Sequence, residues 1–182
     1  MSVMNRGTDS VSKAILNLPN APVNALDVNK RTPLHFAASC GNIEAMKMLL
    51  KRNVDPNCES TSGRSPLHDA ALEGKKNAVS LLLANGASVN KRDKKGDTAA
   101  HLAVHNSHMD VAEELILQGA NFDVTNHQGN SVTELVKSKG GAGKNLLLKI
   151  VEHKRQMEKE KRESMYEAEL RNWKKVRIGE QQ

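Results

Sequence analysis

The chain has 182 residues, a formal net charge of +6 and four aromatic side chains, Phe36, Phe122, Tyr166 and Trp173. Two cysteines are too few for a disulfide framework or a cysteine-rich zinc site. No apolar stretch near the N-terminus suits a signal peptide, and no apolar run is long enough to span a membrane. We therefore expect a soluble protein without a large aromatic core, in the cytoplasm; cytoskeletal, ciliary and nuclear locations stay open.

A ten-residue motif recurs along the first two thirds of the chain. The motif "TPLHFAASCG" at residues 32–41 returns 33 residues later as "SPLHDAALEG" and, after the same interval, as "TAAHLAVHNS". A fixed period between 20 and 50 residues is the signature of a stacked repeat architecture.

Each copy begins with residues that favour the start of a helix. The hydroxyl residues Thr32, Ser65, Thr98 and Ser131 fall in register at the period of 33, and Ser and Thr cap helix N-termini. Proline follows the first two of them, at a helical position where its missing N–H costs nothing. Small residues come next and allow close helix packing, and a glycine then ends the helix in the first two copies.

A second, amphipathic helix follows in each copy. Its apolar residues recur at intervals of three and four, as in "VAEELI" of the third copy. It ends at Asn53, Gly86 or Gly119, residues that accept a left-handed backbone. A polar turn then leads to the next hydroxyl cap.

This helix–turn–helix unit resembles the ankyrin repeat, and the resemblance covers about 145 residues, on the period and motifs quoted above. It implies an all-α ankyrin-repeat solenoid with a long C-terminal α-helical extension. The third copy has lost its proline and its stop glycine, and the fourth has Glu134 in place of the recurring histidine. The expected organisation is a flexible N-terminus at 1–8, an array at 9–151 and a charged helical tail at 152–182. Within the array we expect an N-terminal half repeat at 9–31, repeats at 32–64, 65–97 and 98–130, and a degenerate repeat at 131–151.

The regularly spaced histidines His35, His68 and His101 are interpreted as structural, because in the ankyrin family this histidine bonds within and between repeats. His101, His105 and His108 could share a helical face, but the first of these already has that role, so no metal site is expected. The segment "GGAGKN" lacks the first glycine and the final hydroxyl of a phosphate-binding loop. No catalytic constellation stands out, so we expect a non-enzyme without cofactors.

Three asparagines, Asn24, Asn57 and Asn90, occupy the turn position that an asparaginyl hydroxylase modifies in many ankyrin proteins. The resemblance thus makes them candidate hydroxylation sites. The alternative is that asparagine suits the turn for structural reasons alone.

The resemblance assigns partner recognition to the tips of the turns and the exposed side of each first helix, on the concave face of the array. Six basic residues, from Arg31 to Lys95, make the tips basic and favour an acidic protein partner, although charge in turns also serves solubility. Phe36, Leu72 and Leu102 are expected to be apolar anchors. The candidate partner-binding residues on this face are Asn29, Arg31, Phe36, Ser39, Cys40, Ser62, Arg64, Asp69, Leu72, Glu73, Lys94, Lys95, Asp97, Leu102, His105, Asn106, His127 and Gln128.

The tail is the more basic part of the chain, with 11 Lys and Arg against 7 Asp and Glu over residues 144–182. Strong helix formers fill it and no Gly or Pro interrupts it between Lys144 and Gly179, which predicts a continuous helix. Its candidate docking residues are Tyr166, Leu170, Trp173, Lys174 and Lys175. The alternative is a tail that folds back on the repeats or stays disordered.

The expected function is that of an adaptor or a structural subunit, possessing a concave docking face and a second docking surface on the tail. A large cytoskeletal or ciliary assembly suits such a bridge. The alternative is a regulatory subunit in signalling or transcription that masks or recruits a factor through the repeats alone. We expect the protein to bind neither a small-molecule substrate nor a membrane. Nucleic-acid binding is not favoured, because the sequence has no stacking platform and no recognised nucleic-acid-binding motif.

Overall fold

The computed structural model describes residues 22–179, and every named element there is an α-helix. The helices are α2 (Pro33–Cys40), α3 (Ile43–Lys51), α4 (Pro66–Leu72), α5 (Lys76–Ala84), α6 (Ala99–His105), α7 (Met109–Leu117), α8 (Val132–Ser138) and α9 (Gly141–Gly179). The expected flexible segment 1–8, and residues 9–21 of the expected half repeat, lie outside the described residues.

The first helix of each repeat begins where the hydroxyl residues predict. Thr32, Ser65, Thr98 and Ser131 are the N-caps of α2, α4, α6 and α8, each with an extended backbone. The left-handed stop of α2 falls on Gly41, with φ of 70°. Ser107 takes the corresponding position after α6 with φ of 65°, so the backbone conformation persists although the glycine has been lost.

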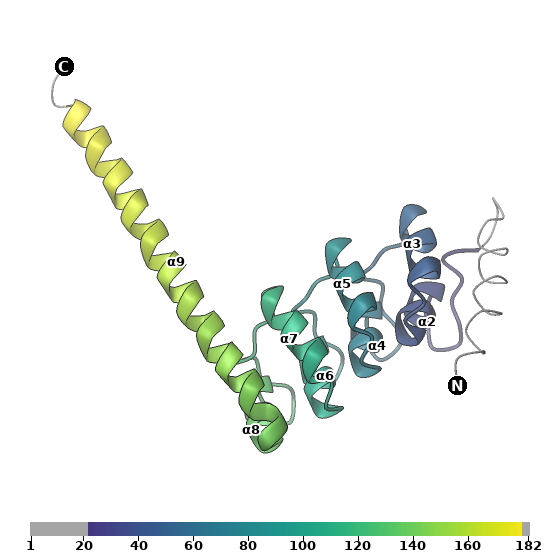
Figure 1. Cartoon of the computed structure of the whole chain (residues 1–182). Helices are drawn as coiled ribbons and strands as arrows, with labels where there is room; N and C mark the ends of the chain where they lie inside the picture. The colour runs from purple at the N-terminus through teal and green to yellow at the C-terminus, as the bar shows by residue number, and fades with distance from the viewer. Residues whose placement is uncertain (1–21, 180–182) are drawn as a thin grey trace.

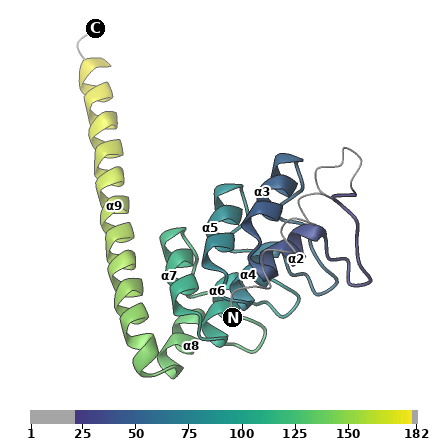
Figure 2. The same ribbon diagram turned by 45° about the vertical axis from the view of Figure 1, so that its right-hand side comes forward.

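The helices form two layers. The inner layer consists of α2, α4, α6 and α8, in which each helix packs on the next. The outer layer consists of α3, α5, α7 and the first part of α9, packed in the same order. The layers are visible side by side in Figures 1 and 2. One apolar core runs between them along the array, built from side chains such as Leu34, Met46, Leu67, Leu82 and Leu115.

The last repeat passes directly into a long helix. The position that ends the second helix of earlier repeats holds Asn53, Gly86 and Gly119, but one period later it holds Glu152. Because nothing there favours a left-handed stop, α9 continues to Gly179. Its 39 residues give a length of about 58 Å. Figure 1 shows α9 leaving the array beside α8 and extending well beyond it.

The all-α solenoid with a C-terminal helical extension is thus confirmed. The extension begins at Gly141, slightly earlier than the expected start at Lys144, and its first turns serve as the outer helix of the fourth repeat. The outer helix of the fourth repeat and the tail are therefore one continuous helix across the expected boundary at residue 151.

Candidate protein-binding surfaces

The recurring histidines fix the turns that carry the candidate surface. In the second repeat the backbone N–H of Ser65 donates to Nδ1 of His68 at 3.1 Å. Nδ1 is therefore an acceptor, and the proton of the neutral ring sits on Nε2, which donates to the carbonyl oxygen of Asp97 at 3.2 Å. Burial lowers the pKa of His68, which favours this neutral ring.

The same network recurs in the neighbouring repeats. His35 bridges Thr32 to the carbonyl of Arg64, and His101 bridges Thr98 to the carbonyl of Asn130. Burial lowers the pKa of His101 as well. These contacts support the structural interpretation of the three histidines.

The three histidines near α6 are not gathered around one point. His101 is buried in its cap network and His105 is exposed. His108 places Nε2 3.1 Å from the carbonyl oxygen of Leu72 in the preceding repeat. Within the described part of the chain, no group of three or more His, Cys, Asp or Glu side chains could hold a metal ion.

Backbone hydrogen bonds join the tips of successive turns. Thr61 N–H donates to the carbonyl of Asn29 at 2.8 Å, and Lys94 N–H to that of Ser62 at 3.0 Å. The N–H of His127 donates to the carbonyl of Lys95 at 2.9 Å. The tips therefore form one connected ridge, and side chains on it are held at fixed spacings.

Most of the basic side chains expected at the tips have internal partners. Arg31 pairs with Asp27 at 2.9 Å, and Arg64 lies 3.4 Å from Asp93. Lys91 pairs with Glu59 at 2.9 Å. Arg92 donates to the carbonyls of Gly96 and Thr125. Carboxylates thus offset the charges of Arg31, Arg64 and Lys91, whereas Arg92, which bonds to carbonyls, keeps its charge.

Lys94 and Lys95 are the basic tip residues that stay available. Both side chains are exposed, and neither forms an ion pair within residues 22–179. Lys94 contributes a favourable charge to the nearby Glu59, whose pKa is lowered first by its hydrogen bond from Lys91. Lys30 on the first tip is likewise exposed and forms no ion pair among the described residues, so these three lysines supply uncompensated positive charge on the ridge.

The apolar anchors expected on the inner layer are differently exposed. The ring of Phe36 is 42% exposed, and the guanidinium of Arg31 lies 4.2 Å from its centroid. Leu72 is half-buried. Leu102 is only 6% exposed, so its assignment as an exposed anchor was wrong: its side chain is buried.

The remaining candidates on this face divide between exposed and occupied side chains. Asp97 accepts a hydrogen bond from Asn126 at 2.7 Å, and Asn106 donates to the carbonyl of Leu102 at 2.8 Å. Ser39 donates to the carbonyl of Phe36 at 3.0 Å. Asp69 is half-buried, and its burial raises its pKa. The remaining candidates that are exposed are Asn29, Cys40, Ser62, Glu73, His105, Asn106, His127 and Gln128.

Two of the asparagines at the candidate hydroxylation position form hydrogen bonds between successive repeats. Nδ2 of Asn57 donates to the carbonyl of Gly86 at 2.9 Å, and Ser88 N–H donates to Oδ1 of Asn57 at 2.8 Å. Asn90 bonds to the following repeat in the same manner, through Gly119 and Asn121. Asn24, the third candidate, is exposed. Asn57 and Asn90 therefore have a structural role, and hydroxylation stays a prediction.

The predicted docking residues of the tail lie on α9. Tyr166 is 68% exposed, Trp173 is 56% exposed and Leu170 is also exposed. Lys174 and Lys175 fall in the last turns of α9, where their side chains lie outside what the structure describes. The helix thus presents an aromatic patch far along its length.

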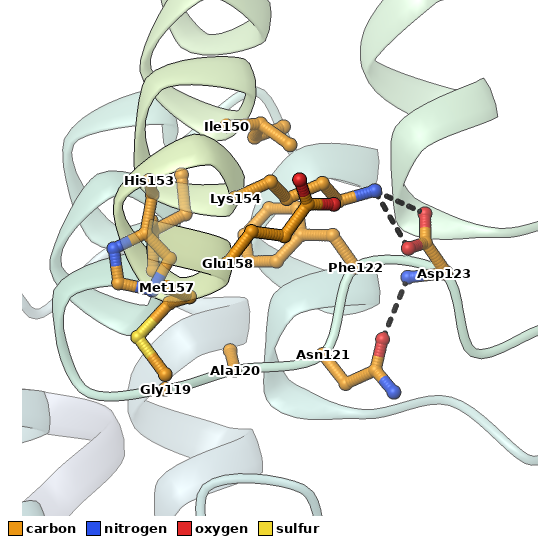
Figure 3. Close-up of a pocket in the computed structure, with 11 residues that line it drawn as sticks. Gly119, Ala120, Asn121, Phe122, Asp123, Ile150, His153, Lys154, Met157 and Glu158 are labelled. Atoms are coloured by element: carbon orange, nitrogen blue, oxygen red, sulfur yellow. Dashed lines mark hydrogen bonds and ion pairs between the residues drawn. The ribbon is translucent and has the colours of Figure 1, made fainter. Parts of the chain in front are cut away.

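A cleft lies where α9 separates from the array, a feature that the sequence did not indicate. It has a volume of about 400 Å³ between the segment 119–123 and α9, with Phe122, Ile150 and Met157 among its lining residues. Figure 3 shows the ion pair of Lys154 and Asp123 beside it. Only knowledge that α9 diverges from the array could have predicted this cleft.

Comparison with protein families bears directly on the repeats. A family model described as ankyrin repeats, in three copies, matches residues 1–93, and a single ankyrin-repeat model matches residues 95–127. No helix among the described residues combines the length and apolarity needed to cross a membrane.

Two relatives share short segments with the chain. A transient receptor potential cation channel subfamily A member 1 homolog of Caenorhabditis elegans is 44% identical over 52 residues, which is 29% of this chain and 4% of that protein. An ankyrin repeat-containing protein of Schizosaccharomyces pombe is 48% identical over 48 residues, which is 26% of this chain and 20% of that protein. The chain thus spans a small part of the length of these relatives.

Proposed function

The chain belongs to the ankyrin-repeat family, and from that premise we propose that it is a non-enzymatic adaptor or structural subunit that joins two proteins. One protein docks on the inner layer and the ridge of turn tips. The other docks on α9. The observation that carries this proposal is the pairing of a rigid array with a long, largely exposed helix that bears its own aromatic patch.

The inner surface has the composition of a protein-binding site. Phe36, covered on one side by Arg31, offers apolar area beside a cation at one end of the array. Aromatic residues and arginine are enriched in protein interfaces. Lys94 and Lys95 add unpaired positive charge two repeats away. These features support a partner whose surface is acidic opposite the third tip and has an apolar residue opposite Phe36.

The second surface gives the protein its bridging character. The side chains at positions 159–171 are exposed all round α9. An exposed helix with an aromatic patch is typical of a docking element. The length of α9 supports a bridging role, which we propose is exercised within a large cytoskeletal or ciliary assembly.

Site-specific photocrosslinking tests the inner surface. A photoreactive residue would replace Phe36 or Lys94 on the inner side, and Lys47 or Lys76, exposed on the outer layer, as matched controls. The proposal predicts the same protein adduct from both inner positions and none from the outer positions. Adducts from the outer positions alone would overturn it. Adducts that persist from the inner positions, with none from Tyr166, would favour the regulatory alternative.

A further inference from the structure

One face of α9 carries a continuous stripe of exposed side chains. At 3.6 residues per turn, Leu148, Arg155, Lys159, Arg162, Tyr166, Leu170 and Trp173 fall within about 80° of one another. All are exposed. The stripe runs about 38 Å from Leu148 to Trp173. It is apolar at one end, basic in the middle and aromatic at the other end.

The stripe faces away from the array. Leu146 and Ile150, which are buried against the repeats at 3% and 4% exposure, lie about 180° round the helix from Leu148, which is 63% exposed. Met157, beside the cleft, lies on the array side as well. Because α9 is continuous, Tyr166 and Trp173 cannot contact their own repeats unless the helix breaks. The fold-back alternative for the tail therefore does not fit the structure.

The middle of the stripe is electropositive and open. Lys159 has a weak internal partner, Glu163, at 3.9 Å. Within residues 22–179, neither Arg155 nor Arg162 forms an ion pair. Glu152 is the one carboxylate on the stripe among the described side chains. An incoming partner can therefore gain by placing carboxylates opposite these three cations.

Two other occupants of the stripe fit less well. In a symmetric pair of α9 helices, the basic middle sections of the two copies would meet and repel each other. An anionic membrane fits less well, because a helix that lies in a membrane interface buries a broad apolar face, whereas residues 152–165 of α9 have only Met157 and Met165 as apolar side chains. An acidic protein segment therefore fits the stripe better than either.

We propose that the stripe on α9 receives an acidic amphipathic helix of a partner protein. That helix lies along α9, with carboxylates opposite Arg155, Lys159 and Arg162. Apolar residues at its two ends cover Leu148 and the patch of Tyr166, Leu170 and Trp173. This inference rests on the proposed role of α9 as a docking surface, and it adds the chemistry and the length of the bound segment.

The single tryptophan of the chain is a built-in probe for this interaction, because Trp173 lies on the stripe. The full chain would be titrated with a designed helical peptide of about 25 residues, long enough to span the stripe. It carries leucines at both ends and glutamates in the middle. A second peptide has lysines in place of the glutamates. The glutamate peptide is expected to shift Trp173 emission to shorter wavelength and to bind at least about tenfold more tightly than the lysine peptide.

A charge-reversed variant sharpens the test. R155E/R162E is expected to weaken the glutamate peptide about tenfold or more and to improve binding of the lysine peptide. K161E/R171E makes the same change of charge on the opposite side of α9 and should leave the preference intact. Circular dichroism confirms that each variant keeps its helix content.

Several results would overturn the inference. Equal binding of the two peptides, no binding of either, or equal effects of the two charge reversals would each do so. A Trp173 shift with phosphatidylserine vesicles and not with peptide would assign the stripe to membranes, and concentration-dependent dimers in sedimentation would assign it to a second copy. Crosslinking from Phe36 tests the inner surface independently of the stripe. A failure of the proposal for the stripe can therefore be distinguished from a failure of the proposed inner-surface function.

Discussion

Lys154 of α9 donates to both carboxylate oxygens of Asp123, at 2.7 and 2.6 Å. Asp123 occupies the repeat position of Asn57 and Asn90, each of which bonds to the carbonyl at the end of the next outer helix. In the last repeat there is no such helix end, because α9 continues. An ion pair to the side of α9 takes the place of the hydrogen bond, and it lowers the pKa of Asp123.

This ion pair is expected to hold residues 150–158 of α9 against the array while adding little to the free energy of unfolding of the whole chain. Asp123→Asn should change the free energy of unfolding by less than about 1 kcal/mol, since the pair is exposed. Amides near 150–158 should nevertheless exchange faster, as measured by hydrogen exchange. The double variant D123K/K154D restores opposite charges and should restore slow exchange. If the amides of residues 150–158 exchange at the same rate in Asp123→Asn as in the unmodified chain, apolar packing alone holds this segment of α9 against the array.

Stability should fall as the pH is lowered through the range in which histidine titrates. Burial lowers the pKa of His68 and His101 in the folded state, so the unfolded chain takes up protons first as the pH drops below the ordinary value of 6.5. The contribution of these histidines to the free energy of unfolding is present in full above that pH. It declines as the pH falls towards their lowered folded pKa values, by up to about 1.4 kcal/mol per pH unit for each histidine. Urea unfolding at pH 7.5, 6.5 and 5.5 measures this slope.

A matched variant separates the buried histidines from the exposed ones. His68→Gln removes one of the two titrations and should reduce the slope, whereas His127→Gln alters an exposed side chain and should not. A slope that is absent, or equally reduced by both substitutions, would contradict the assignment of neutral cap histidines.

Ser107, at the end of α6, is expected to carry backbone strain. Its φ of 65° is unfavourable for a residue with a side chain, by about 1–2 kcal/mol. Its hydroxyl accepts a hydrogen bond from Lys139 at 3.2 Å, which offsets part of this cost. Ser107→Gly should therefore raise the free energy of unfolding by up to about 1 kcal/mol. Chemical denaturation measures the change, and a loss of stability would mean that the Lys139 contact matters more than the backbone.

Gly143 is expected to be indispensable for the packing of α9 on α8. A Cβ at this position would overlap the carbonyl oxygen of Val136. Gly143→Ala should destabilise the last repeat by about 3 kcal/mol, since backbone must move. Gly141→Ala, where a Cβ meets nothing within 4 Å, is the control and should be neutral or slightly stabilising. Similar stabilities for the two variants would contradict the tight α8–α9 junction.

The repeats could be predicted in detail because their signals are local. A hydroxyl, a proline or a histidine at a fixed interval determines where a helix begins and how its turn is closed, and the structure places these residues as expected. The histidine is replaced by Glu134 in the last repeat for a visible reason. Glu134 accepts from Ser131 at 2.9 Å, and with no following turn to bridge, the second ring donor of histidine is unnecessary.

The binding surface was harder to predict because it depends on distant partners. The charge of Arg64 is offset by Asp93, 29 residues away in the next repeat. Leu102 occupies the same repeat position as the exposed Phe36, yet α6 has inner-layer neighbours on both sides, α4 and α8. The repeat period places Phe36 and Leu102 at the same position and cannot show that one side chain is exposed and the other buried. The direction of the stripe on α9 likewise required the burial of Leu146 and Ile150 to be known.

A chain with two photoreactive residues shows whether one molecule holds two different proteins at once. Photoreactive residues would replace both Phe36 and Tyr166 in the full chain, which would be crosslinked in the native cell extract and analysed by mass spectrometry. We expect single chains that carry two different proteins, one at each position. The bridging role is contradicted if each chain carries one adduct at most, or if the same protein occupies both positions.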